Sequence, residues 1–136
     1  MFLNLLNDEE KKIFLQLAIS VIQADGKVEE TEKAYIADYC REMEINQNDL
    51  EKVIDPMPLI EKISNNSSES VKRIFLLELL ACANSDGNFA DIEKALIVTF
   101  VKKSGLPDSL LDNCWSLLQD YSRVSLNMMS FIQGVK

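Results

Sequence analysis

The stretch ADGKVEETE, residues Ala24 to Glu32, decides the fold, because a variant of it, SDGNFADIE, returns at residues 85–93. Both stretches follow strongly apolar segments, and the second begins 61 residues after the first. The same offset aligns residues 11–36 with residues 72–97, and ten of those 26 positions are identical. The chain therefore contains an internal duplication. Two copies are too few for a solenoid, which favours a compact pair packed face to face about a pseudo-twofold axis.

Each copy is predicted to form two helices joined by an Asp-Gly turn. Before the first turn, Ile13, Leu17 and Val21 recur at helical spacing, and their apolar neighbours widen the stripe until the helix should be almost enclosed. The matching segment, residues 69–85, is equally apolar. We therefore expect these two helices to pack against each other at the centre of the molecule.

The ends of the predicted helices carry recognisable cap signals. Asn7 or Asp8 can cap the first helix, with Glu10 close to the capping-box position. Gly105 ends the second helix of the second copy in the manner of a C-cap, and Pro107 prevents that helix from continuing. These signals predict the boundaries of the repeats independently of the apolar pattern.

The remaining segments also favour helices. The second helices of the two copies are predicted over about residues 29–43 and 91–104. A short helix is expected near residues 48–54, one or two turns at residues 59–63, and two amphipathic helices in the region 108–133. Since no segment alternates apolar and polar residues as a strand does, the predicted fold class is all-α, a compact bundle of about seven helices.

The length fits one domain over residues 1–136. The first repeat is expected over about residues 8–45, the second over about residues 69–106, and the C-terminal helices over about residues 108–133. No run of eighteen apolar residues or secretory leader is recognised, which predicts a soluble, cytoplasmic protein without direct membrane insertion.

The charge and the rare residue types limit the function. A net charge of -8 opposes binding to nucleic acid or to an anionic membrane, so the expected partners are other proteins, while the oligomeric state stays open. The chain has no histidine, which excludes Ser-His-Asp and Cys-His catalysis by its own residues, and we expect no enzyme. Cys40, Cys82 and Cys114 are predicted to be reduced, buried thiols.

The repeated turn matches only the second half of a calcium-binding EF-hand loop. Gly26 and Glu32 keep the EF-hand interval between the bend and the bidentate ligand, and the second copy keeps it too. The position of the opening carboxylate, however, is occupied by Val21 and Cys82. Because this carboxylate supplies much of the affinity, we do not expect calcium sensing of the EF-hand kind.

Two interpretations of the acidic turns remain open. In the first, Asp, Gly and Glu serve turn geometry alone, since carboxylates can accept hydrogen bonds from the free N–H groups that open the next helix. In the second, the pseudo-twofold axis brings both turns together, and their carboxylates share a divalent cation. The structural interpretation is favoured. The carboxylates that crowd these turns are those of Asp25, Glu29, Glu30 and Glu32 in the first copy and of Asp86, Asp91 and Glu93 in the second.

At these residues the chain resembles the TerB-like family, found among tellurite-resistance proteins and in the N-terminal part of DjlA-type co-chaperones. The resemblance rests on an apolar helix that runs into A-D-G-x-[VI]-x-x-x-E, here residues 24–32, and on a second Asp-Gly helix pair about sixty residues later. It covers about residues 11–118. It implies an all-helical fold of about seven helices, a non-enzymatic role in stress-linked assemblies and acidic metal ligands in each repeat. The candidate metal ligands that the resemblance implies are Asp25, Glu32, Asp86 and Glu93, with Glu29 as an addition. A J-domain is not expected, because it needs a histidine.

Two further features have alternative explanations. Trp115, Tyr121, Met128, Met129 and Phe131 could form an adaptable docking surface, although core packing of the last helices is the favoured interpretation. Glu78 interrupts an otherwise apolar helix at the position where the first copy has Leu17. We expect it to reach water or to find a partner such as Arg73 or Lys102.

Overall fold

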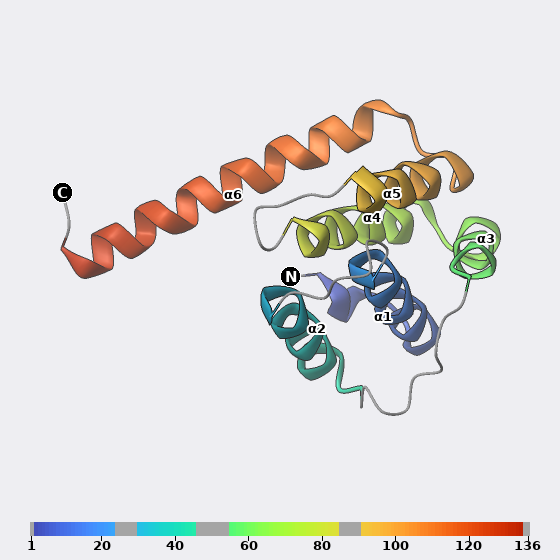
Figure 1. Cartoon of the computed structure of the whole chain (residues 1–136), viewed down its shortest axis with the longest axis horizontal. Coiled ribbons are helices and arrows are strands. Elements are labelled where there is room, and N and C mark those ends of the chain that lie inside the picture. The colour runs from blue at the N-terminus through green and yellow to red at the C-terminus, as the bar shows by residue number, and fades with distance from the viewer. Residues whose placement is uncertain (1, 24–29, 46–54, 85–90, 135–136) are drawn as a thin grey trace.

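The computed structural model describes residues 2–23, 30–45, 55–84 and 91–134, and all regular elements within those ranges are helical (Figure 1). They are η1 (Leu3–Leu5), a 3-10 helix, followed by α1 (Asp8–Gln23), α2 (Glu30–Met43), α3 (Met57–Asn66), α4 (Glu69–Ala83), α5 (Asp91–Lys103) and α6 (Ser109–Gln133). The all-α prediction is confirmed, and the number of helices is close to the predicted seven. The helix predicted at residues 48–54 lies outside the described residues.

Helices α1 and α4, the first helices of the two repeats, form the centre of the fold and pack against each other as predicted. Phe14 and Phe75, which occupy equivalent positions in the repeats, meet edge to face with their ring centroids 5.4 Å apart. Both side chains are completely buried. A contact between equivalent residues is what a pseudo-twofold axis between the repeats requires.

The aromatic contacts continue outward from this pair in both directions. Tyr39 of α2 lies edge to face on Phe14 at a centroid distance of 5.2 Å, and Phe100 of α5 stacks on Phe75 at 6.0 Å. Tyr39 and Phe100 are also equivalent under the 61-residue offset. In each repeat the second helix therefore contacts the first through aromatic rings at the same two positions. The four rings form one continuous row through the core.

The predicted N-terminal caps are present. Asn7 and Glu10 form a reciprocal capping box, in which the Asn7 Oδ1 accepts from the Glu10 N–H at 2.8 Å and the Glu10 Oε1 accepts from the Asn7 N–H at 3.0 Å. The other Glu10 oxygen accepts from the Ser67 hydroxyl at 3.1 Å. Ser68 caps α4 by accepting from the Val71 N–H. Glu10 therefore connects the start of α1 to the segment that leads into α4.

The second helices of both repeats end with the same backbone geometry. Gly105 has the left-handed conformation predicted for a C-cap, with φ of 76°, and Glu44, exactly one repeat earlier, has φ of 57°. In each case the following residue, Ile45 or Leu106, donates its N–H to the carbonyl five residues back, at 2.9 and 3.1 Å. The backbone conformation is thus repeated beyond the identical residues, including at a position where one copy has glycine and the other has glutamate.

The C-terminal region differs from its prediction, because one continuous helix, α6, replaces the two expected within residues 108–133. Neither glycine nor proline occurs between residues 109 and 133, so no residue there forces a break. The first part of α6 packs on α4, whereas its second part projects away from the other helices (Figure 1). None of the described helices is long and apolar enough to span a membrane.

We predict that Glu44→Gly stabilises the protein. A left-handed conformation costs a residue with a Cβ about 1–2 kcal/mol, and glycine avoids this cost but loses about 0.5–1 kcal/mol through its greater freedom in the unfolded chain. Because the Glu44 side chain is exposed, the expected gain is about 0.5–1 kcal/mol in the free energy of unfolding, measured by urea denaturation.

The matched control is Gly105→Ala at the equivalent cap. A Cβ added at Gly105 meets no atom within 4 Å, so this substitution tests backbone conformation alone. It should lower the free energy of unfolding by about 1 kcal/mol. A destabilised Glu44→Gly variant would contradict the prediction.

Candidate functional site: an acidic pocket beside helix α6

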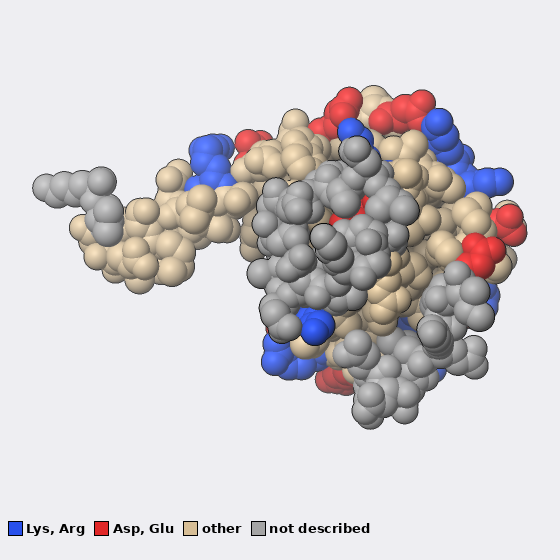
Figure 2. All heavy atoms as spheres, viewed as in Figure 1, with Lys and Arg blue, Asp and Glu red and all other residues tan. Residues whose placement is uncertain are grey.

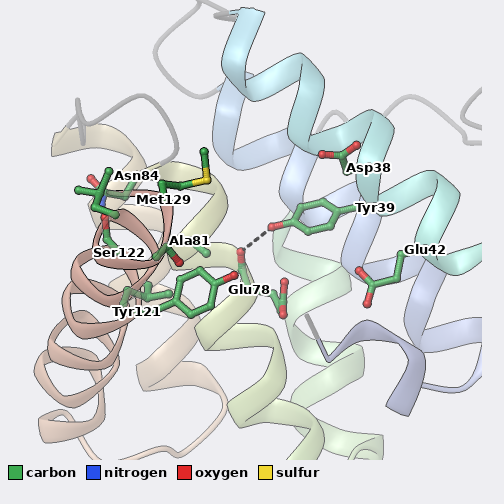
Figure 3. A pocket seen from close by; sticks show the side chains of 12 residues that line it. Asp38, Tyr39, Glu42, Glu78, Ala81, Asn84, Tyr121, Ser122 and Met129 are labelled. Atoms are coloured by element: carbon green, nitrogen blue, oxygen red, sulfur yellow. Dashed lines mark hydrogen bonds between the residues drawn. The ribbon is translucent and has the colours of Figure 1, made fainter. Parts of the chain in front are cut away.

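A pocket of about 500 Å³ opens between α2, α4 and the second half of α6 (Figure 3). Asp38, Tyr39 and Glu42 line it from α2, and Glu78 and Ala81 line it from α4. Helices α2 and α6 both contact α4, which therefore lies between them at the bottom of the pocket. Its volume lies in the range of small-molecule and peptide-anchoring sites.

Glu78 is the most deeply buried carboxylate of the pocket, with only 1% of its surface exposed. Its Oε1 accepts a hydrogen bond from the backbone N–H of Phe2 at 3.0 Å. Its backbone carbonyl accepts from the Tyr39 hydroxyl at 3.2 Å, the bond drawn in Figure 3. Arg73, one of the partners expected from the sequence, pairs with Glu69. Glu78 thus joins the N-terminal segment to α4, a role that the sequence did not indicate.

Helix α6 contributes the third wall of the pocket. Leu118, Ser122, Ser125 and Met129 line it and lie on one side of α6, because their spacings of three and four residues match the helical repeat. The small side chains of Ser122 and Ser125 leave space at the middle of this stripe, and the apolar side chains of Leu118 and Met129 lie at its two ends. The wall can therefore contact both a polar backbone and an apolar anchor.

The charge of the pocket is negative. Three of its lining residues, Asp38, Glu42 and Glu78, carry carboxylates, and none of the described residues that line it is Lys or Arg. Arg41 forms an ion pair with Asp38 on the exposed side of α2 and offsets part of this charge. Asp38 and Glu42 are four residues apart on one helix, a spacing that places both on one face. That spacing was visible in the sequence, but nothing there indicated that this face would border α6.

Most of the candidate metal ligands lie outside what the structure describes. Asp25, Glu29 and Asp86 fall in the undescribed turns, and Glu32 lies in the first turn of α2 without a described side chain. Glu93, in the first turn of α5, is 3% exposed. Within the described ranges no group of three or more Cys, Asp or Glu side chains could hold a metal ion. The metal site therefore stays a prediction.

The opening positions of the EF-hand pattern are described and lie inside helices. Val21 belongs to α1 and Cys82 to α4, and both side chains are buried in the core. Neither can contribute a charged oxygen to an ion. This placement agrees with the sequence-based exclusion of EF-hand calcium sensing.

The three cysteines lie within the described residues and form no disulfide. Cys82 is fully buried as predicted, whereas Cys40 and Cys114 are only partly buried. Burial raises the pKa of the Cys40 thiol above its ordinary value. Burial likewise raises the pKa of Cys114, and the charge of Arg73 opposes this shift without cancelling it. Both thiols therefore hold their protons more strongly than an exposed cysteine, which disfavours a role as nucleophile.

The prediction of core packing for the last aromatic and methionine residues is wrong for most of them. Trp115 packs partly buried against the core, but Tyr121, Met128, Met129 and Phe131 are all exposed. The reason is that α6 continues straight past the end of α4 and so carries these side chains into solvent (Figure 1). They belong to a surface, as the alternative interpretation held.

The arrangement of the helices matches a solved structure of a tellurite resistance protein from Nostoc punctiforme. The match covers 96% of this chain and 84% of that chain, with a TM-score of 0.69 and 18% sequence identity. The chain has a TerB-like fold. This likeness supports the fold expected from the Asp-Gly repeats. No family model matches the sequence, and a search of curated proteins found no significant match.

We predict that Glu78→Ala destabilises this TerB-like fold by about 0.5–1.5 kcal/mol, because the backbone N–H of Phe2 loses its acceptor. Glu78→Gln should cost less, since its amide oxygen can still accept the same bond. Urea denaturation of both variants checks this order. Equal losses of stability in the two variants would show that the hydrogen bond to Phe2 contributes nothing.

Proposed function

We propose that this chain is a non-catalytic interaction module that binds a partner protein at the acidic pocket between α2, α4 and α6. The single observation that carries the proposal is the pocket itself, which combines three carboxylates with an apolar helix wall. Together with the fold shared with a tellurite resistance protein, it supports a role in a stress or tellurite-resistance system.

The non-catalytic part of the proposal rests on the chemistry of the side chains. The sequence contains no histidine to serve as a general base near pH 7. The partly buried thiols of Cys40 and Cys114 have raised pKa values, so their thiolate forms are disfavoured. The pocket therefore offers hydrogen-bond acceptors and apolar contacts, which favours a binding function over catalysis.

The pocket also indicates what kind of partner it would select. The exposed carboxylate of Glu42 attracts positive charge, while Leu118, Leu126 and Met129 offer apolar contact, with methionine adapting to different shapes. A helical segment with Lys or Arg beside one or two large apolar side chains satisfies both requirements. We therefore propose a basic amphipathic helix of another protein as the occupant.

Glu42→Lys tests this assignment. The experiment first identifies proteins that the wild-type chain retains from an extract of its native cells, then purifies the strongest candidate and titrates it by calorimetry. Replacing a carboxylate by an ammonium group should weaken the Kd by at least about tenfold, which corresponds to about 1.4 kcal/mol. The loss should be smaller at high salt, where exposed charges are screened.

The matched control is Glu61→Lys, which makes the same charge change on the exposed face of α3 and should leave the Kd unchanged. If both variants bind as tightly as the wild type, the partner does not use the pocket and the proposal is wrong. If both lose affinity equally, net charge rather than the pocket explains the binding.

Divalent cation binding by the acidic turns is the second candidate, and the register of the repeats favours it. α2 begins at Glu30 and α5 at Asp91, one repeat apart, so Glu32 and Glu93 occupy equivalent places in the first turns. If the pseudo-twofold axis also relates Asp25 to Asp86, carboxylates from both repeats could converge on one ion, without any need for the EF-hand opening ligand.

Calorimetric titration with calcium, magnesium, manganese and zinc tests the cation site. We expect a binding heat for one of these ions that disappears in Asp25→Asn/Asp86→Asn and persists in Glu61→Gln/Asp112→Asn, which removes two charges elsewhere. An absence of heat in the wild type would contradict cation binding and leave the interaction module as the sole function.

A further inference from the structure

Helix α6 carries a second apolar face beside the one that lines the acidic pocket. Along it, apolar residues recur at alternating intervals of four and three over three heptads, the spacing of a coiled-coil seam. We call this stripe the α6 seam. Its members are Leu110, Cys114, Leu117, Tyr121, Val124, Met128 and Phe131.

The two ends of the α6 seam have different surroundings. Leu110 and Cys114 are partly buried against the core, where α6 packs on α4. From Leu117 onward the seam side chains are exposed, up to 86% for Phe131. A shallow groove beside Val124 and Phe131 follows this exposed part. The helix therefore continues an apolar seam beyond the part of the molecule that can cover it.

The exposed part of the seam is also electrically neutral. Residues 124–134 contain no charged side chain, and the charged residues that precede them, Asp120 and Arg123, lie 3.7 Å apart as an ion pair. In Figure 2 the described part of the projecting end of α6 is mostly tan, the colour of residues other than Lys, Arg, Asp and Glu. This composition disfavours an anionic lipid surface, because interfacial helices place several Lys or Arg on their polar face. It also disfavours a strongly charged partner.

A second copy of the same helix satisfies these conditions. Two neutral seams approach without the repulsion that the net charge of -8 imposes on other parts of the surface. At about 60–120 Å² of apolar area for each covered side chain, the five exposed seam residues and Ile132 would bury about 700–1,400 Å² in a pair. That area reaches the lower limit for specific interfaces and corresponds to a reversible, concentration-dependent dimer.

We propose that the chain forms an isologous dimer in which the α6 seams of two copies pair in antiparallel orientation. Antiparallel pairing places the two acidic bodies at opposite ends of the helix pair, whereas parallel pairing would bring them side by side. Val124, midway between Leu117 and Phe131, then lies near the twofold axis. Tyr121 borders both faces of α6, because it also lines the acidic pocket. The other pocket residues of α6, from Leu118 to Met129, stay directed toward the pocket of their own chain, so the inference goes beyond the proposed function and does not depend on it.

Val124→Asp/Met128→Asp tests the seam in the full-length chain. Sedimentation velocity over a range of concentrations should show a monomer–dimer equilibrium for the wild type and a dimer weakened at least about a hundredfold for the variant, since each substitution acts twice in the interface. Gln119→Asp/Ser130→Asp adds the same charge on the opposite, polar side of α6 and should dimerise like the wild type. Val124→Ala/Met128→Ala, which adds no charge, should weaken the dimer to a smaller extent.

Cysteine cross-linking tests the orientation. In a Cys40→Ser/Cys114→Ser background, which removes the two partly buried native thiols, a mixture of Leu117→Cys and Phe131→Cys chains should form the mixed disulfide on mild oxidation, whereas Phe131→Cys alone should form no disulfide-linked dimer under the same conditions. Rapid cross-linking of Phe131→Cys with itself would overturn the antiparallel arrangement.

Three outcomes would overturn the dimer itself. They are a monomer at every concentration, a dimer that the seam variants leave unchanged, and binding of the wild type to phosphatidylcholine vesicles through α6 without self-association. Glu42→Lys should dimerise normally, so a failure of the pocket and a failure of the seam can be distinguished.

Discussion

The fold depends on the edge-to-face contact between Phe14 and Phe75, which joins equivalent positions of the two repeats. Both rings are fully buried and their centroids are 5.4 Å apart, so this contact holds α1 against α4 at equivalent positions of the two repeats. Tyr39 and Phe100 then attach the second helix of each repeat to this pair. Such aromatic pairs stabilise a core beyond the area that they bury, and their geometry restricts the crossing of the helices.

The functional surface follows from what this core leaves uncovered. Helices α1 and α4 bury their apolar faces on each other and on α2 and α5, and among the described residues α6 makes its main contact with α4, along its first turns. The rest of α6 has one side over the acidic pocket and another side in solvent. One helix thus presents two different surfaces, an acidic and apolar pocket suited to a basic helix and a neutral seam suited to its own copy.

Some parts of the site could have been predicted from the sequence and others could not. The i, i+4 spacing of Asp38 and Glu42 predicts an acidic face on α2, and the heptad spacing from Leu117 to Phe131 is present in the sequence. Their roles could not be derived, because both depend on how far α6 extends past α4. Glu78 is a similar case: periodicity places it in the core, but its hydrogen bond to Phe2 depends on where the N-terminal segment lies.

The sequence by itself determined the duplicated helical pairs, their caps and the central place of α1 and α4, because apolar periodicity and cap chemistry are local properties of the chain. It also predicted the C-cap at Gly105, whereas the equivalent left-handed conformation of Glu44 is known only from the structure. Only the tertiary structure decided that α6 is one straight helix and that its second half stays uncovered. The pattern of a buried stripe and that of an exposed seam are the same in the sequence, and only the presence or absence of a facing helix distinguishes them.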